Sequence, residues 1–323
     1  MPGDRPNVLV AWHLVDAVAD DFATRFNVRD ITEMSDPRAW LAANGSTIRG
    51  FAHSYLGKVD AAFLEMLPAL EIISHFGVGY DDVDVAAAAR RNIVVTNTPD
   101  VLTDEVADLT VGLLIATVRR IPQAERHLRE GLWASSGRFP LSATLRGKRV
   151  GILGLGRIGQ AVATRLEAFG LTIAYNGRHR QPGVPYAYYP TAVALASAVD
   201  ILVVATPGGE GTRRLIDAGL LKALGPNGVL INVARGSVVD EAALVQALND
   251  GTIAAAGLDV FEDEPCAPAA LIACDNAVLL PHIAAASFAT RDAMARLVLD
   301  NLASWFDGKG PLTPVAETPW PQR

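Results

Sequence analysis

A glycine-rich turn constrains the fold of this chain more than any other part of its sequence. It reads Gly154-Leu155-Gly156-Arg157-Ile158-Gly159, follows the apolar run Arg149–Leu153 and precedes a helical pattern that extends to about residue 169. Another apolar run, residues 171–175, comes next. In such a context the first glycine permits a tight turn, the second lets backbone approach a phosphate, and the third lets the helix pack on the strand. We therefore predict a dinucleotide's pyrophosphate at the N-terminus of this helix.

Short apolar runs alternate with helical patterns on both sides of the turn. Further strands are expected at Asn7–Ala11 and at residues 46–52, 71–76, 93–96, 201–205, 229–233, 255–259 and 277–280, and helices at 15–25, 83–91, 103–120 and 288–306. Alternation of this kind predicts an α/β protein with two doubly wound parallel sheets. We expect a Rossmann nucleotide-binding domain, residues 100–285, inserted into a flavodoxin-like substrate domain formed by residues 1–99 and 286–323.

Composition argues against several classes of partner. The formal net charge of −7 speaks against nucleic acid. The first residues lack the apolar core of a signal peptide, and the longest apolar run, residues 109–118, is too short to span a bilayer, so no membrane partner is expected. The only cysteines, Cys266 and Cys274, match no metal-binding spacing. We predict a cytoplasmic protein without a metal site.

Three charged or polar residues follow predicted strands of the second half, where open α/β sheets bind ligands: Arg235, Glu264 and His282. A guanidinium can grip the carboxylate of a 2-oxo acid and polarise its ketone. The imidazole can protonate the forming alkoxide, and a carboxylate on its other nitrogen favours the charged ring. Taken singly, each residue also has a structural interpretation, as a surface ion-pair partner, a turn residue or a satisfied histidine.

Together with the glycine turn, these residues resemble the D-isomer-specific 2-hydroxyacid dehydrogenases over nearly the whole chain. The resemblance maps the family's catalytic Arg, Glu and His onto Arg235, Glu264 and His282. Formate dehydrogenases are disfavoured because they carry Gln where Glu264 stands. Within the family, the chain is most similar to the NADPH-preferring glyoxylate/hydroxypyruvate reductases. The segments that carry the resemblance are residues 75–81, 97–108, 154–159, 176–178, 232–240, 257–265 and 281–284.

The resemblance implies further roles. The backbone N–H groups of Val78 and Gly79 bind the substrate carboxylate with Arg235, near His282, and Asp259 orients the nicotinamide amide. Asp240 supports the loop after Arg235 and takes no part in the chemical step. The implied cofactor contacts are Thr103, Gly154, Leu155, Gly156, Arg157, Ile158, Gly159, Asn176, Gly177, Arg178, Thr206, Pro207, Val233, Ala234, Asp259 and Ala284.

The resemblance also implies a homodimer, formed by a dimerisation helix and arm at residues 103–147. Within the arm, Trp133 or Phe139 could reach the pocket of a neighbouring subunit.

The segment after the second Rossmann strand bears on the choice of nucleotide. NAD-specific domains place an acidic residue about twenty positions beyond the glycines, to bind the ribose 2′-hydroxyl. This chain has Asn176-Gly177-Arg178 there, with no carboxylate to repel a 2′-phosphate. We predict NADP(H) in preference to NAD(H), the alternative being that the arginine belongs to a solvated loop.

The substrate stays open at this stage. Glyoxylate and hydroxypyruvate fit the resemblance best, and bulkier 2-oxo acids remain an alternative. His53 lies near the expected pocket, where we favour a structural role for it. A nucleotide-sensing binding protein of the same fold, similar to the C-terminal-binding-protein corepressors, is a second alternative. Phosphite as substrate would need further cationic residues that the sequence does not identify.

Overall fold

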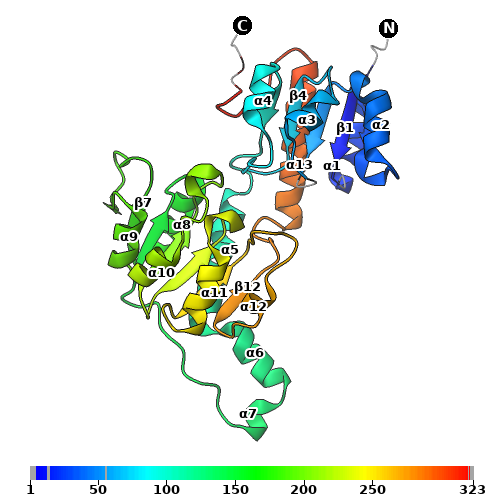
Figure 1. Cartoon of the computed structure of the whole chain (residues 1–323). Coiled ribbons are helices and arrows are strands. Elements are labelled where there is room, and N and C mark those ends of the chain that lie inside the picture. Colours follow the sequence, from blue (N-terminus) through cyan, green and yellow to red (C-terminus); the bar gives the residue numbers. More distant parts are fainter. Residues whose placement is uncertain (1–4, 13–14, 55–56, 319, 321–323) are drawn as a thin grey trace. The chain divides into compact units, whose positions relative to one another are not determined.

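The computed structural model describes residues 5–12, 15–54, 57–318 and 320, and the chain forms two compact units. Unit 1 consists of residues 1–102 and 287–323, and unit 2 of residues 103–286. Unit 2 is thus an insertion within unit 1, as Figure 1 shows by the blue, cyan and orange-red segments that make up unit 1.

Unit 1 is built on a five-stranded parallel sheet with the strand order β2-β1-β3-β4-β5, the order of flavodoxin-like folds. Helix α13, from the far end of the sequence, packs against α1 and β4 and so closes the unit. The elements are β1 (Asn7–Ala11), α1 (Asp16–Arg25), β2 (Asn27–Asp30), α2 (Pro37–Asn44), β3 (Gly50–His53), α3 (Ala61–Glu65), β4 (Ile72–His75), α4 (Val85–Arg90), β5 (Val94–Thr96) and α13 (Phe288–Phe306).

Unit 2 contains a seven-stranded parallel sheet with the order β12-β11-β10-β9-β6-β7-β8. The order reverses at β6, which makes its carboxyl end the topological switch point. The elements are α5 (Thr103–Arg119), α6 (Ile121–Arg129), α7 (Leu132–Ser135), β6 (Arg149–Leu153), α8 (Arg157–Glu167), β7 (Thr172–Asn176), β8 (Ala187–Tyr188), α9 (Ala192–Ala198), β9 (Ile201–Val204), α10 (Ala218–Leu224), β10 (Val229–Asn232), α11 (Glu241–Asn249), β11 (Ala255–Leu258), α12 (Ala269–Ile272) and β12 (Ala277–Leu279).

The sequences of the central strands explain why both sheets are parallel and covered. All four residues of β9, Ile-Leu-Val-Val, are buried, and so are the last four of β6, Val-Gly-Ile-Leu. Continuous apolar runs form strands whose two faces are both covered by helices, whereas a strand with one solvent-exposed face alternates apolar and polar residues. Aspartate side chains begin several of the covering helices: Asp84 accepts from Ala87 N at the start of α4, and Asp240 accepts from Ala243 N at the start of α11. The predicted fold class, two doubly wound parallel sheets, is confirmed.

Two details differ from the sequence prediction. The strand expected at residues 46–52 begins only at Gly50, because Gly45–Thr47 form a 3₁₀ turn closed by a hydrogen bond from Ile48 N to the Gly45 carbonyl. The edge strands β2 and β8 were not predicted. They are short and only partly buried, and neither contains the continuous apolar run that marks an inner strand.

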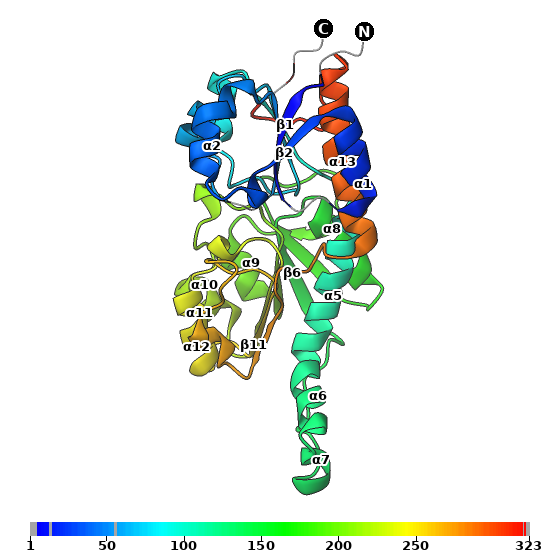
Figure 2. The ribbon, with the colours of Figure 1, turned by 90° about the vertical axis from the view of Figure 1, so that its right-hand side faces the viewer.

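The helical arm of unit 2 changes direction at Arg120. This residue is in the left-handed conformation, with φ of 52°, between the end of α5 and Pro122 in the first turn of α6. Proline lacks the N–H that a continuous helix would need, so the break falls just before it. Helices α6 and α7 extend beyond the seven-stranded sheet (Figure 2). Among the described residues, no helix combines the length and apolar character needed to cross a bilayer.

Candidate active site

The glycine turn lies at the carboxyl end of β6, and its three glycines meet different surroundings. Gly154 has a φ of +95°, and a Cβ there would lie 2.7 Å from the backbone of Thr206. A Cβ on Gly159 would lie 2.2 Å from the Gly154 carbonyl oxygen. A Cβ on Gly156 would meet no atom within 4 Å, so the protein's own packing does not require glycine there. Open space at this position leaves room for a ligand phosphate, which is what a dinucleotide needs.

The N-terminus of α8 provides a partial positive charge that complements a negatively charged phosphate. Gly156 caps the helix without a side-chain hydrogen bond, and helix α8 continues for eleven residues. The N–H groups of such a first turn, together with the helix dipole, favour an anion. The residues present therefore fit a dinucleotide's pyrophosphate at Gly154–Gly159.

The segment after β7 carries the residues predicted to select the nucleotide. The Asn176 side chain donates from Nδ2 to the Tyr189 carbonyl oxygen at 2.8 Å, a structural use of this amide that the sequence did not predict. Arg178 is exposed in the following loop. Gln181 ties this loop to the glycine turn: its Nε2 donates to the Leu155 carbonyl oxygen at 2.7 Å. Gln181 belongs to no motif, so sequence reasoning gave no signal for it.

Six further predicted cofactor residues occupy three loops and one helix start. Thr206 and Pro207 follow β9, Val233 and Ala234 follow β10, and Ala284 is buried after β12. Because the strands are parallel, these loops share one edge of the sheet with the glycine turn. Thr103 is the first residue of α5. Their contacts with a cofactor remain a prediction.

Arg235, Glu264 and His282 come from the loops that follow β10, β11 and β12. These three strands are neighbours in the sheet and run parallel, so their carboxyl ends lie side by side. This topology brings together side chains that are far apart in the sequence. The sequence predicted their position after strands, and the strand order makes them neighbours.

His282 and Glu264 form a close pair. Nδ1 of His282 lies 2.6 Å from Oε2 of Glu264, and each side chain is 33% exposed. Oε1 of Glu264 accepts a hydrogen bond from Phe261 N at 3.0 Å. Burial raises the pKa of Glu264, but the hydrogen bond and charge of His282, the Phe261 N–H and the charge of Arg235 together lower it below its usual value. The carboxylate is therefore ionised and orients the imidazole so that Nε2 is the nitrogen presented for proton transfer.

The backbone at His282 is held in an uncommon conformation by Asp259. His282 has a φ of +53°, and its N–H donates to the Asp259 carbonyl oxygen at 2.8 Å. The Asp259 carboxylate, fully buried, accepts from Ile283 N at 2.8 Å and from Ala284 N at 2.9 Å. Burial raises the pKa of Asp259, although these two hydrogen bonds oppose the shift. Asp259 thus positions the catalytic candidate, a function that sequence reasoning missed; its role toward a nicotinamide amide stays a prediction.

Arg235 is positioned by two residues that no sequence argument singled out. The Asn232 side chain donates to the Arg235 carbonyl oxygen at 2.9 Å and accepts from Ala234 N at 3.0 Å. A Cβ on Gly236 would overlap the Phe261 carbonyl group, at 2.0 Å from its oxygen. Gly236 therefore lets the Arg235 loop pack directly against the loop that carries Glu264. Asp240 caps α11, which agrees with the supporting role expected for it.

In unit 1, the predicted carboxylate-binding residues Val78 and Gly79 follow β4. The Gly77 carbonyl oxygen accepts from Thr98 N at 2.9 Å, and the Val78 carbonyl oxygen accepts from Asn97 Nδ2 at 2.8 Å. In a trans peptide the N–H points away from the C=O. The Asn97–Thr98 segment therefore directs the N–H groups of Val78 and Gly79 to the side opposite itself.

His53 is buried in unit 1 and bonds to Asp82, with 2.8 Å between Nε2 and Oδ2. This placement agrees with a structural role for His53.

Comparisons with known proteins agree with this geometry. Residues 111–284 match the family model described as D-isomer specific 2-hydroxyacid dehydrogenase, NAD binding domain. The chain is 44% identical over 308 residues to glyoxylate/hydroxypyruvate reductase A of Arabidopsis thaliana, covering 95% of this chain and 98% of that protein. It is 49% identical over 278 residues to hydroxyphenylpyruvate reductase of Plectranthus scutellarioides, covering 86% and 88% of the two chains.

A solved structure shows the same likeness over the full length. The crystal structure of NADPH-dependent glyoxylate/hydroxypyruvate reductase from Sinorhizobium meliloti, in complex with NADP and malonate, superposes with a TM-score of 0.94 at 53% identity and covers 99% of each chain. The family model spans more than half of the chain, and the relatives extend the match to nearly all of it. The chain therefore belongs to the D-isomer-specific 2-hydroxyacid dehydrogenase family.

Proposed function

We propose that this protein reduces small 2-oxo acids, glyoxylate and hydroxypyruvate first among them, to 2-hydroxy acids with NADPH. The observation that carries the proposal is the His282–Glu264 pair beside the Arg235 loop, at the same sheet edge as the glycine turn. This is the residue set that a 2-oxo acid reduction needs. The substrates named for the Arabidopsis and Sinorhizobium relatives support the choice of acid.

Each group has a separate role in the proposal. Unit 2 holds the dinucleotide through Gly154–Gly159, and unit 1 holds the substrate carboxylate through the N–H groups of Val78 and Gly79. When bound, the nicotinamide supplies a hydride for the carbonyl carbon. Arg235 binds the substrate carboxylate and polarises the carbonyl group. His282 donates the proton from Nε2 to the carbonyl oxygen, while Glu264 on Nδ1 stabilises the charged ring.

The test is a panel of 2-oxo acids assayed with NADPH and with NADH. Glyoxylate and hydroxypyruvate with NADPH are expected to give the highest kcat/KM. A preference for hydroxyphenylpyruvate would favour the second candidate, a reductase of bulkier acids, which the 49% identity to the Plectranthus enzyme supports. Tight NADPH binding with no turnover of any acid would favour a nucleotide-sensing protein instead.

Arg178→Ala is expected to weaken NADPH selectively. Arg178 is exposed in the loop after β7, where a guanidinium can neutralise the 2′-phosphate of NADPH. A charge-assisted hydrogen bond of this kind contributes about 1.5–3 kcal/mol, or roughly a tenfold to hundredfold change in affinity. We expect KM for NADPH to rise by about that factor while KM for NADH changes little. Arg38→Ala, an exposed arginine on α2 of unit 1, is the matched control. Equal losses with both nucleotides would refute the selecting role of Arg178.

Glu264→Gln is expected to move the alkaline limb of the reduction profile to lower pH, because the imidazolium loses its anionic partner. The measurement is kcat/KM from about pH 5 to pH 9 in both proteins. An unchanged limb would contradict the pairing.

Glu264 also links stability to pH. Its folded-state pKa is lowered, so its ionisation stabilises the fold above the ordinary carboxyl pKa. This contribution is lost as the pH falls through the lowered folded-state value.

The proposal includes a homodimer formed through α5, α6 and α7. Apolar side chains on and after this arm are exposed in the single chain, with Trp133 63% and Leu141 100% exposed. Phe139 packs against His127 and Arg120, which leaves Trp133 as the better candidate to reach a partner. Light scattering of the purified protein measures the mass.

The thiols of Cys266 and Cys274 are unpaired, which fits the proposed cytoplasmic location.

A further inference from the structure

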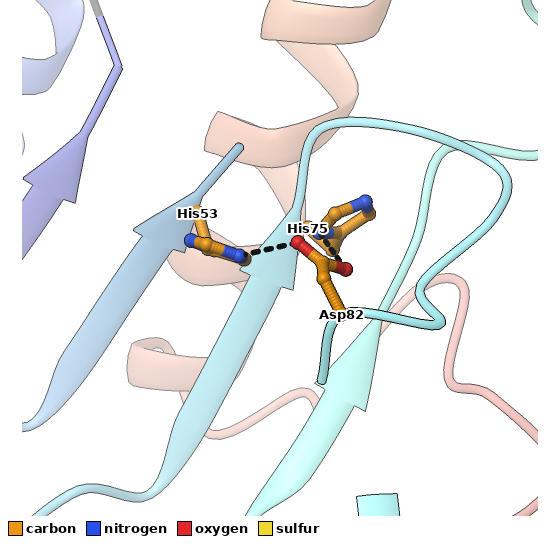
Figure 3. Close-up of side chains that lie close together, drawn as sticks. All are labelled: His53, His75 and Asp82. Atoms are coloured by element: carbon orange, nitrogen blue, oxygen red, sulfur yellow. Dashed lines mark hydrogen bonds and ion pairs between the residues drawn. The ribbon is translucent and has the colours of Figure 1, made fainter. Parts of the chain in front are cut away.

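A second cluster of titratable side chains lies in unit 1, at the ends of β3 and β4 and in the loop that also carries Val78 and Gly79. It consists of His53, His75 and Asp82, whose facing nitrogen and oxygen atoms all lie within 4.8 Å of one another (Figure 3). The His53 side chain is 2% exposed, that of His75 is fully buried, and that of Asp82 is 14% exposed. The proposed reduction does not use this cluster.

The sheet places the two histidines together. His53 is the last residue of β3 and His75 the last of β4, and the two are register partners in adjacent parallel strands. Register partners project from the same face of a sheet. The imidazole rings therefore lie side by side, with 5.4 Å between their centroids.

Asp82 is held in place by its own backbone, independently of the histidines. The Asp82 carbonyl oxygen accepts from Val59 N at 2.9 Å, and Asp84 N donates to the Val59 carbonyl oxygen at 2.9 Å. These bonds fix the segment on both sides of Val83. The side chain then reaches the histidines from the loop after β4, as Figure 3 shows. The three groups are thus preorganised by two strands and a braced loop.

Hydrogen bonding alone does not satisfy this cluster. Oδ2 of Asp82 lies 2.8 Å from His53 Nε2, whereas Oδ1 lies 3.9 Å from His75 Nδ1, too far for a hydrogen bond. Oδ1 is buried and has no hydrogen-bond partner among the described residues. Burial raises the pKa of Asp82, but the hydrogen bond from His53, the charges of both histidines and a hydrogen bond from its own backbone outweigh it and lower the pKa. The group is an ionised carboxylate facing two imidazoles.

We propose that His53, His75 and Asp82 form a zinc-binding site in unit 1. Two imidazole nitrogens and one carboxylate oxygen are a donor set that suits Zn²⁺. Bonds of 2.0–2.2 Å in a tetrahedral site separate the ligand atoms by about 3.4 Å. The separations of 2.8 Å and 3.9 Å from Asp82 lie on either side of this value, and the three ligand atoms all lie within 4.8 Å of one another, so side-chain shifts of about 1 Å accommodate the ion. Water takes the fourth position, entering past Asp82, the most exposed of the three.

No sequence motif indicates this metal site, because its three proposed ligands are spread over thirty residues with no characteristic spacing. A bound ion would link the ends of β3 and β4 to the segment Gly77–Asp84. This segment includes Val78 and Gly79, the residues proposed to hold the substrate carboxylate. The proposal concerns metal binding, which is measured without turnover, so its outcome is distinguishable from that of the proposed function.

The test is a titration of the purified full-length chain, without a polyhistidine tag and after removal of metals with a chelator. Zinc chloride is added in a calorimeter. We expect one ion per chain with a Kd of about 1 µM or tighter. Binding should weaken as the pH falls, because the imidazoles must be deprotonated. It should also raise Tm by a few degrees. Cobalt chloride should give the visible absorption of a tetrahedral site.

Variants locate the ion. Asp82→Asn and His53→Gln, checked for folding by circular dichroism, are expected to weaken zinc binding by about 100-fold or more, because even loss of a residue that only orients a metal ligand costs roughly 10–100-fold. His179→Gln removes an exposed histidine, and His282→Gln breaks the other histidine–carboxylate pair; both should bind as the parent does. Absence of stoichiometric binding in the parent protein overturns the proposal. So does unchanged binding in a folded Asp82→Asn protein. The zinc titration of the unmodified protein tests the proposal even if a variant fails to fold.

Discussion

His282→Gln is expected to lower kcat for glyoxylate reduction by about 100-fold or more, the usual contribution of a general acid. The imidazole is the proton donor in the proposed reaction, and it is set for that role by Glu264 at 2.6 Å from its Nδ1. Glutamine has an amide of similar reach but no acidic proton, so hydride transfer would have to leave an unprotonated alkoxide. The measurement is kcat under saturating NADPH and substrate.

The variant should still bind NADPH as the parent protein does. His282 belongs to the loop after β12, whereas the proposed pyrophosphate cradle, Gly154–Gly159, follows β6. Equilibrium binding of NADPH by fluorescence supplies this control. Near-normal turnover by His282→Gln would show that another group donates the proton.

Arg235→Gln is expected to reduce kcat/KM for 2-oxo acids by about 100-fold or more, comparable to removal of an oxyanion-stabilising donor. The guanidinium is proposed to contact both the carboxylate and the developing oxyanion, so the loss should appear in KM and in kcat. Its charge also contributes to the lowered pKa of Glu264. Assays at several substrate concentrations separate the expected rise in KM from the expected fall in kcat.

Arg235→Lys distinguishes geometry from charge. Lysine keeps the positive charge but cannot form the planar, two-pronged contact of a guanidinium. We expect Arg235→Lys to recover only a small part of the lost kcat/KM. Full recovery would mean that Arg235 acts as a point charge, and the proposed bidentate grip would be wrong.

The sequence predicted the elements best where apolar runs were continuous. β6 and α13 have the predicted limits, and the inner strands differ from prediction by a few residues at most, apart from the late start of β3 at Gly50. Buried parallel strands need apolar residues on both faces, which leaves a clear pattern in one dimension. The edge strands β2 and β8 are short and only partly buried, leave no such pattern, and were missed for this reason.

The candidate site was predictable only in part. Arg235, Glu264 and His282 could be named because they follow strands and resemble a family pattern. Asn232, Gly236 and Gln181 could not, since their contribution lies in contacts with backbone groups elsewhere in the chain. The role predicted for Asp259 toward a nicotinamide amide stays a prediction, and the hydrogen bonds that its carboxylate accepts from the backbone of Ile283 and Ala284 were not foreseen.

The sequence by itself determined the α/β alternation, the place of the glycine turn and the missing acidic residue after β7, because these depend on local conformation and residue type. Only the tertiary structure decided which distant groups meet. The parallel order of β10, β11 and β12 brings Glu264 to His282, and the register of β3 with β4 brings His53 to His75. Strand order and register arise from packing between segments far apart in the chain, which no local pattern records.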